Sequence, residues 1–211
     1  MWRRRQTHKG GLKIVFIGNS ITLHGASQKI GWLHEWGMAA SAAEKDFVHI
    51  VTRGLEERSG RKADVRVRNL ARFERNFATY DYDLDKDLIA FAPDYLIVAL
   101  GENVAHLATQ EERLAYYAAF KRLLEGFLKA RPGMKAIVRG VFWPSPWKDE
   151  LMARAASELS IPFVKADIAT DESMMALGLF EHKGVQRHPG DKGMAEIARI
   201  ILAGLQEAAG K

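Results

Sequence analysis

The stretch Ile14-Val15-Phe16-Ile17-Gly18-Asn19-Ser20-Ile21-Thr22 decides the fold of this chain. Its first four residues are all apolar, which predicts a strand buried on both faces, as in a parallel sheet. Gly18 and Asn19 then permit a sharp turn, and Ser20 follows at the carboxyl end of the strand, where open α/β sheets bind their ligands. A second interpretation is that Asn19 or Ser20 caps a following helix. The role of Ser20 therefore depends on partners elsewhere in the chain.

Length and composition are those of a globular domain. The chain has 211 residues, of which 47% are hydrophobic and 27% are charged, so it is long enough to bury a sizeable core. No internal repeat or linker interrupts it. We expect a basic amino-terminal tail at residues 1–11 and a single domain at residues 12–211.

The hydropathy of the sequence indicates where in the cell the protein is expected. The longest strongly apolar run, Tyr95–Leu100, is too short to span a bilayer, so we expect no membrane insertion. Residues 1–5 have the charge of a signal peptide, but residues 6–11 supply no apolar segment behind them. As written, the chain is expected in the cytoplasm, or outside it if a signal peptide has been removed.

Charged and metal-binding residues exclude several functions. The net charge is +5, part of it in Arg3-Arg4-Arg5. No nucleic-acid motif is present, so we predict no nucleic-acid partner and interpret the excess charge mainly as solvation, with attraction to an anionic substrate as a second interpretation. The chain has no cysteine, which excludes disulfides, thiolate sites and cysteine nucleophiles. None of the seven histidines pairs with a nearby carboxylate at metal-ligand spacing, so no metal is predicted.

Strands and helices alternate along the sequence. Apolar runs and alternating patterns predict strands at residues 14–17, 63–67, 95–100, 135–142 and 161–164. Periodic segments with caps and stops predict helices at residues 38–58, 84–91, 109–131, 148–159 and 172–177 and after residue 191. Parallel strands need crossover connections. The pattern therefore predicts an α/β protein, a three-layer flavodoxin-like sandwich in which a five-stranded parallel sheet carries helices on both faces.

Chemically capable residues follow the ends of these strands. Ser20 follows the first strand, and Asn103 follows the third in Gly101-Glu102-Asn103. His188 lies in the last loop, before the terminal helix. A serine, an amide and a histidine at one sheet edge suit acyl transfer, which needs a nucleophile, a base and donors for the oxyanion.

His188 has a particular local setting. It precedes Pro189, a residue favoured in the first turn of a helix. The positive end of that helix disfavours an imidazolium, which helps to keep the ring neutral and able to accept a proton. The alternative is a surface histidine in a loop.

Four further residues are candidates for substrate contact. Arg72 and Glu74 look too polar for a buried turn and could recognise polar groups of a substrate, with plain surface charge as the alternative. Glu102 is expected to face solvent or to bond locally rather than to act in catalysis. Trp143 could form an apolar platform for a sugar ring, or it could pack within its loop.

Three motifs, in order, resemble the SGNH (GDSL-type) hydrolase family. Gly18-Asn19-Ser20-Ile21-Thr22 is similar to the family's Gly-Asp-Ser-(Ile/Leu)-Thr, Gly101-Glu102-Asn103 to its Gly-x-Asn, and His188-Pro189 to its last block. The resemblance implies that Ser20 is the nucleophile and His188 the base, and that Asn103 and backbone N–H groups form the oxyanion hole. Members of the family are mostly esterases, lipases and carbohydrate deacetylases that need no cofactor.

The sequence departs from that family at two positions. Residues 70–74 lack the glycine of the family's second block, which implies a bulkier and more charged pocket and a small polar substrate rather than a lipid. Val185 stands where the family has an aspartate that orients the histidine. A backbone carbonyl, a water or another carboxylate could replace it; the carboxylate candidates are Asp167, Asp171 and Glu181.

These observations lead to two functional hypotheses. The first is a serine esterase that removes short, acetyl-like acyl groups from a carbohydrate or a similar small polar ester. The second is a protein of the same fold that has lost catalysis with its aspartate and retains the cleft to bind a polar ligand. The oligomeric state does not follow from the sequence.

Overall fold

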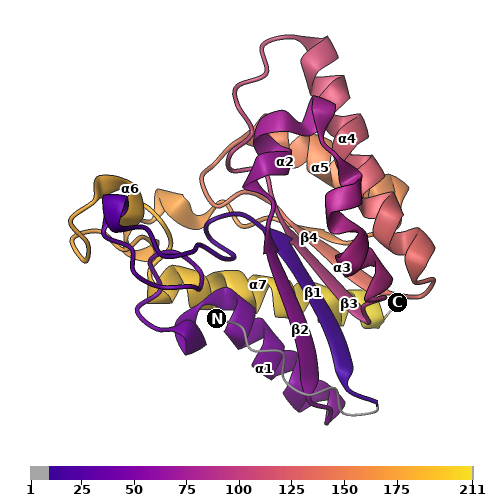
Figure 1. Cartoon of the computed structure of the whole chain (residues 1–211), viewed down its shortest axis with the longest axis horizontal. Helices are drawn as coiled ribbons and strands as arrows, with labels where there is room; N and C mark the ends of the chain where they lie inside the picture. Colours follow the sequence, from indigo (N-terminus) through magenta and orange to yellow (C-terminus); the bar gives the residue numbers. More distant parts are fainter. Residues whose placement is uncertain (1–9, 211) are drawn as a thin grey trace.

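A five-stranded parallel sheet lies between two layers of helices in the computed structural model, which describes residues 10–210 (Figure 1). The strand order is β2-β1-β3-β4-β5. The strands are β1 (Leu12–Gly18), β2 (Ala63–Asn69), β3 (Tyr95–Ala99), β4 (Lys135–Arg139) and β5 (Phe163–Val164). The predicted flavodoxin-like sandwich is confirmed. Most of the predicted basic tail, residues 1–9, lies outside the described residues.

The central strand β1 is buried on both faces, as its apolar run predicts. Ile14 and Phe16 join one hydrophobic cluster, whereas Val15 and Ile17 join the other. Because side chains alternate along a strand, a strand between two helical layers needs apolar residues at every position. This is why residues 14–17 form an unbroken apolar run.

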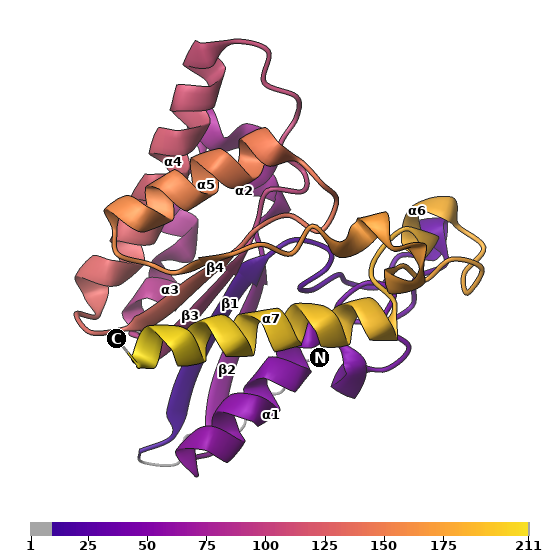
Figure 2. The ribbon, with the colours of Figure 1, turned by 180° about the vertical axis from the view of Figure 1, so that it is seen from behind.

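Helices cover both faces of the sheet (Figures 1 and 2). The first layer contains α1 (Phe47–Ser59) and α7 (Asp191–Ala209). The second contains α2 (Ala71–Asn76), α3 (Lys86–Ala90), α4 (Gln110–Ala130) and α5 (Pro146–Glu158). A capping box at Thr109 and Glu112 begins α4, as the sequence predicts. The short helix α6 (Lys183–Gln186) belongs to neither layer.

The helix predicted at residues 38–58 is wrong in its first half. Regular helix begins only at Phe47, because the Asp46 side chain accepts a hydrogen bond from the His49 N–H and caps it. Asp46 also accepts from the Gly37 N–H at 3.1 Å, which ties the preceding loop to the cap. Ala39 has a positive φ of 75°, which a helix does not allow.

Three other predicted elements are shorter than expected, and one of them is the strand predicted at 161–164, which spans only Phe163–Val164. The helix predicted at 172–177 is a single 3₁₀ turn, Glu172–Met174, because Met175 is extended and pairs with Pro189. The strand predicted at 135–142 ends at Arg139. The Gly140 N–H still donates to the Val164 carbonyl oxygen at 2.8 Å. From Val141 on, side-chain carboxylates replace the strand partner, since the Val141 N–H donates to Asp149 at 2.9 Å.

A small lobe extends the carboxyl edge of the sheet. It combines residues 24–40 with residues 175–188, two segments far apart in sequence that lie side by side at α6 (Figures 1 and 2). Its core is a separate cluster around the fully buried Trp32, which packs with Met38 and Val185. The lobe therefore forms a wall beside the carboxyl edge of the sheet.

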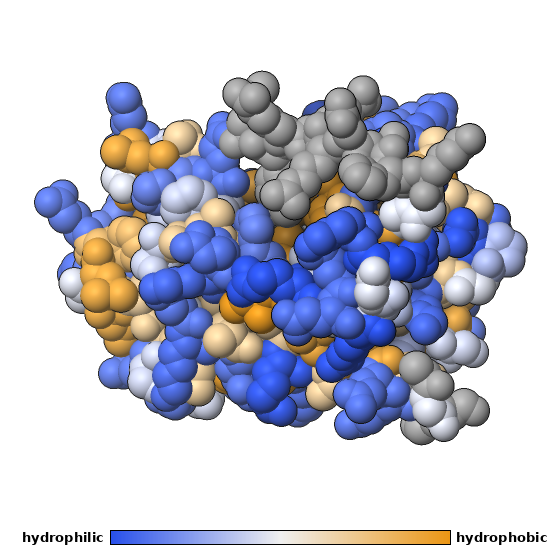
Figure 3. Space-filling view, turned by 90° about the horizontal axis from the view of Figure 1, so that it is seen from below, coloured by the Kyte–Doolittle hydropathy of each residue, from blue (hydrophilic) through white to orange (hydrophobic). Residues whose placement is uncertain are grey.

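The surface is mostly hydrophilic in the view from below, where hydrophobic residues form small separate groups (Figure 3). One such group lies on the side of the lobe. Two leucines of the lobe, Leu33 and Leu179, are exposed. Within residues 10–210, no helix combines the length and the apolar character needed to cross a membrane.

Candidate active site

The turn after β1 presents Ser20. A Cβ on Gly18 would lie 1.8 Å from Thr22 Oγ1 and 2.8 Å from the Ala99 carbonyl oxygen, so only glycine fits at the end of this strand. Asn19 then closes the turn, because its Oδ1 accepts from the Ile21 N–H at 3.2 Å. No helix follows Ser20 directly, so the interpretation of Asn19 or Ser20 as a helix cap is wrong.

Ser20 and His188 are hydrogen-bonded. Ser20 Oγ lies 2.8 Å from His188 Nε2, and His188 Nδ1 lies 2.8 Å from the carbonyl oxygen of Gly184. A carbonyl oxygen can only accept a hydrogen bond, so Nδ1 of the neutral ring carries the proton. The lone pair of Nε2 therefore faces Ser20, and the serine hydroxyl donates to it.

The surroundings of His188 favour the neutral ring. Burial lowers the pKa of the imidazole below its ordinary value, and the nearby His24 lowers it further. The hydrogen bond to Gly184 and the charge of Glu102 act in the opposite direction, with a smaller total effect. At neutral pH the ring can therefore accept a proton. From the sequence we expected the following helix to keep the ring neutral, whereas in the structure burial is the main cause of the lowered pKa.

Within residues 10–210 no carboxylate bonds to the His188 ring, so none of Asp167, Asp171 and Glu181 replaces the aspartate of the family. The Val185 side chain is buried in the core of the lobe, and the Gly184 carbonyl bonds to the histidine instead. Asp167 lies 3.8 Å from Lys165, and Asp171 accepts from Ser173. Of the predicted replacements for the aspartate, the one seen within residues 10–210 is therefore a backbone carbonyl, that of Gly184.

Glu74 lies beneath the site and holds Asn103. The Asn103 Nδ2 and the Gly101 N–H each donate to the Glu74 carboxylate at 2.6 Å, and the Asn19 Nδ2 donates at 3.0 Å. Glu74 is fully buried, so the expectation that it is too polar for a buried turn is wrong. Burial and then the charge of Glu102 raise the pKa of this carboxyl group.

Glu102 is the second buried carboxylate of this network. It forms an ion pair with the fully buried Arg139 at 2.7 Å and accepts from the Phe142 N–H at 3.1 Å. It does not face solvent, and its partners Arg139, Phe142 and Asn19 lie far from it in sequence, so its bonds are not the local ones that the sequence suggested. Burial raises the pKa of Glu102, but Arg139 and the other donors outweigh it and lower the pKa overall.

The Asn19 side chain lies between the two carboxylates and bonds to both, which explains why this position has an amide and not an acid. Its Nδ2 donates both to Glu74 at 3.0 Å and to Glu102 at 2.5 Å. An aspartate at position 19 would place a third negative charge against these two buried carboxylates. Asparagine instead supplies the two donors that they need, which accounts for the departure from Gly-Asp-Ser.

Ser20, Asn103 and His188 line one pocket of about 450 Å³. Arg72 also lines it, whereas Glu74, Glu102 and Trp143 are not among its lining residues. The Trp143 ring instead packs edge-on against the His188 ring at 5.3 Å. The lining residues are Ser20, His24, Ile30, Met38, Asn69, Ala71, Arg72, Arg75, Asn103, His182, Gly184, Val185 and His188.

Solved structures with this architecture include several esterases. A catalytic mutant of an acetylxylan esterase from Geobacillus stearothermophilus is 18% identical, with a TM-score of 0.60 over 94% of this chain and 96% of that one. A psychrotrophic esterase from Pseudoalteromonas sp. is 11% identical, with a TM-score of 0.58 over 94% and 99% of the two chains. A family two carbohydrate esterase from Clostridium thermocellum, in complex with cellohexaose, is 16% identical, with a TM-score of 0.61 over 94% and 65%.

The fold is that of the SGNH esterases. At these low identities the likeness concerns the fold. No protein-family model matches the sequence, and no curated protein matches it. Structures of the Geobacillus esterase with one serine, one aspartate or one histidine replaced by alanine are each described as catalytic mutants.

Apart from His188, the residues that the lobe contributes to the pocket were not predicted from the sequence. His24 and His182 line the pocket but lie in segments for which the sequence predicts no helix or strand, and Met38, which also lines it, lies at the start of the wrongly predicted helix. Arg139 could have indicated a buried ion pair from the sequence alone. It is a charged residue within the apolar run 135–142, and a charge buried there needs a partner. That partner is Glu102.

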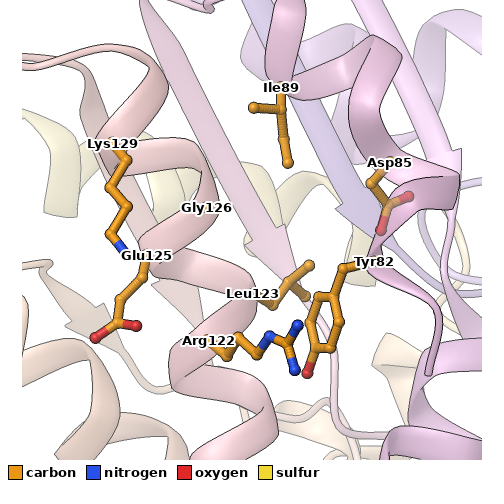
Figure 4. A pocket seen from close by; sticks show the side chains of 8 residues that line it. All are labelled: Tyr82, Asp85, Ile89, Arg122, Leu123, Glu125, Gly126 and Lys129. Carbon is orange, nitrogen blue, oxygen red and sulfur yellow. The ribbon is translucent and has the colours of Figure 1, made fainter. Parts of the chain in front are cut away.

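A second, smaller pocket of about 180 Å³ lies on the helical layer that contains α4. Residues of α4 line one side and Tyr82, Asp85 and Ile89 line the other, with Arg122 beside the Tyr82 ring (Figure 4). None of the described residues that line it is a serine, a histidine or an amide, so it lacks the set of groups that the larger pocket combines. Within the described residues, no cluster of three histidine or carboxylate side chains could hold a metal ion.

Proposed function

We propose that this protein is a serine esterase that hydrolyses short, acetyl-like acyl esters of a carbohydrate. The observation that carries the proposal is the 2.8 Å contact between Ser20 Oγ and His188 Nε2 in a pocket that Asn103 also lines. The fold, shared with acetylxylan esterases and a carbohydrate esterase, supports the same substrate class.

Ser20 and His188 perform the chemistry in two steps. Ser20 Oγ attacks the ester carbonyl while its proton moves to His188 Nε2, and a tetrahedral intermediate forms. The imidazolium then returns the proton to the leaving alcohol oxygen, and an acyl-serine remains. Water, deprotonated by the same nitrogen, attacks the acyl-serine and forms a second tetrahedral intermediate. When this intermediate collapses, the bond to Ser20 Oγ breaks, the imidazolium returns its proton to Oγ and the carboxylic acid leaves. The Gly184 carbonyl keeps the ring in the tautomer that both steps need.

Asn103 and the backbone stabilise the oxyanion. One Nδ2 hydrogen of Asn103 points to Glu74, which leaves the second hydrogen for the substrate. The Ala71 N–H is already engaged by Asn69 Oδ1 at 2.9 Å. The Ser20 N–H forms no hydrogen bond with the described residues. We therefore assign the oxyanion to Asn103 Nδ2 and the Ser20 N–H.

The pocket walls favour a small polar substrate. Arg72 and Arg75 come from α2, at the place where the family's second block has a glycine. Charged walls do not suit a long alkyl chain, because its burial there would desolvate the guanidinium groups. A pocket of about 450 Å³ is large enough for a sugar unit with its acyl group.

Hydrolysis of 4-nitrophenyl esters from acetyl to octanoyl tests the proposal. The wild type should hydrolyse acetyl fastest, and Ser20→Ala and His188→Ala should each lower kcat/KM by at least about 10³-fold. Ser145→Ala and His106→Ala are matched controls: Ser145 makes no side-chain cap bond, and His106 is exposed away from the pocket. Equal rates in all five proteins would refute the mechanism, and a preference for octanoyl would refute the short-acyl substrate.

The second candidate is a carbohydrate-binding protein without catalysis. It is favoured by the absence of any carboxylate on the His188 ring within residues 10–210. Incubation with an acetylated xylo-oligosaccharide separates the two functions. Release of acetate that depends on Ser20 supports the esterase, whereas binding of the intact ester without release supports the binding protein.

A further inference from the structure

We infer that the natural substrate of this site carries an anionic group, a carboxylate or a phosphate, close to the reacting ester. The inference rests on the proposed esterase function and narrows its substrate class. It follows from the charge of the pocket wall. Arg72 and Arg75 line the pocket together with three histidines, and among residues 10–210 no aspartate or glutamate lines it.

Arg72 and Arg75 are among the arginines of the described residues that form no ion pair with a carboxylate. Within the described residues neither guanidinium lies within 4.0 Å of a carboxylate. Ion pairs with carboxylates are instead formed by Arg61, Arg68, Arg131, Arg139, Arg154 and Arg199. The positive charge at the pocket therefore has no protein counter-charge beside it.

The nearby buried carboxylates do not supply that counter-charge. Glu102 is paired with Arg139, and Glu74 is surrounded by N–H donors from Asn19, Gly101 and Asn103. Both side chains lie beneath the pocket and not on its wall. Both carboxylates are bonded to groups beneath the pocket, so Arg72 and Arg75 remain available to a ligand.

The placement of the arginines suits an anion next to the scissile bond. Arg72 and Arg75 are three residues apart on α2, so they share one face of that helix. Arg75 Nη2 donates to Asn103 Oδ1 at 3.2 Å, which puts its guanidinium beside the proposed oxyanion donor. Guanidinium groups bind carboxylates and phosphates with two parallel hydrogen bonds. A positive wall also raises the local concentration of an anionic substrate.

A matched pair of substrates tests whether the charge lies on the sugar. We would compare kcat/KM for a mono-acetylated methyl glucoside and the corresponding methyl glucuronide, which differ by a neutral hydroxymethyl group and a carboxylate. The wild type should prefer the charged ester by about tenfold at low salt, and this preference should shrink as ionic strength rises. Comparison of 4-nitrophenyl acetate with 4-nitrophenyl succinate tests the other source, a charge on the acyl group.

Arginine variants identify the residues responsible. In Arg72→Gln and Arg75→Gln the ratio of charged to neutral kcat/KM should fall toward one. Arg53→Gln is the matched control, because Arg53 is exposed on α1 outside the pocket, and it should keep the wild-type ratio. Retention of the preference in both pocket variants would refute the role of these arginines.

The outcomes separate the inference from the proposed function. If the wild type hydrolyses neutral esters in a Ser20-dependent manner but shows no preference for either charged ester, the esterase stands and the anionic substrate is refuted. If no ester is hydrolysed, the esterase is refuted. Calorimetric binding of the same two glycosides to Ser20→Ala then decides the inference, since tighter binding of the glucuronide supports it and equal binding refutes it.

Discussion

His188 Nδ1 lies 2.8 Å from the carbonyl oxygen of Gly184, four residues earlier in the chain. This contact fixes the ring as the aspartate of a triad would, but with a neutral dipole in place of a full negative charge. The carbonyl sets the tautomer and the direction of Nε2. In the proposed mechanism it would stabilise an imidazolium less than a carboxylate does. We therefore describe the site as a Ser20–His188 dyad held by the backbone.

The pH dependence of the reaction should reflect the neutral ring of His188. Burial lowers the pKa of this histidine, so the base stays deprotonated down to a lower pH than an exposed histidine, whose pKa is about 6.5. The value of kcat/KM should rise with pH and level off, with a midpoint below that value. His24→Gln should move the midpoint upward, because the charge of His24 lowers the pKa of His188. A midpoint unchanged in His24→Gln, or one above 6.5 in the wild type, would contradict this account.

Glu74 should act as a positioning residue for Asn103. Glu74→Gln puts an amide N–H₂ against the donors that now face the carboxylate, including Asn103 Nδ2. We expect kcat to fall about 10-fold to 10²-fold, the range of a weakened oxyanion donor, with KM changing much less. Glu150→Gln on the exposed side of α5 is the matched control. A parallel loss of thermal stability with kcat unchanged would assign Glu74 a purely structural role.

Arg139 should matter for stability because its partner is buried. Arg139→Met leaves Glu102 without its ion pair, which should lower the free energy of unfolding by about 3 to 5 kcal/mol. The double variant Arg139→Met with Glu102→Gln should recover part of that loss, because no uncompensated charge remains. Urea denaturation of both variants measures this. Additive losses in the double variant would show that the two side chains are not coupled.

Gly18 should tolerate no side chain. An added Cβ would overlap Thr22 Oγ1 at 1.8 Å and approach the Ala99 carbonyl oxygen at 2.8 Å. Gly18→Ala should therefore lower the free energy of unfolding by about 1 to 3 kcal/mol and displace Ser20. Gly25→Ala is the control, because a Cβ there would meet no atom within 4 Å. Equal stability of the two variants would contradict the close approach at Gly18.

The sequence predicted the fold because parallel strands leave a strong local signal. A strand covered on both faces must be apolar at consecutive positions, as residues 14–17 and Tyr95–Leu100 are. Chain order then indicated which residues follow the strands. The structure brings Ser20, Asn103 and His188 to one pocket, as expected for the carboxyl edge of a parallel sheet.

Other features of the site depend on contacts that local sequence patterns do not report. The apolar spacing after Met38 suggested one long helix, but the cap at Asp46 and the packing of the lobe set its start at Phe47. Glu74 looked like a surface residue, because its donors come from residues far away in sequence. The Gly184 carbonyl has no side-chain signature, so the sequence could name it only as one alternative among several.

Covalent labelling of Ser20 tests the central claim most directly. The protein would be treated with a fluorophosphonate probe, and the modified peptide would be identified by mass spectrometry. We predict labelling of Ser20 in the wild type, none at that position in Ser20→Ala, and much slower labelling in His188→Ala, because Nε2 accepts the serine proton. An unlabelled Ser20 in folded wild-type protein, or equal labelling rates in the wild type and His188→Ala, would contradict the Ser20–His188 dyad.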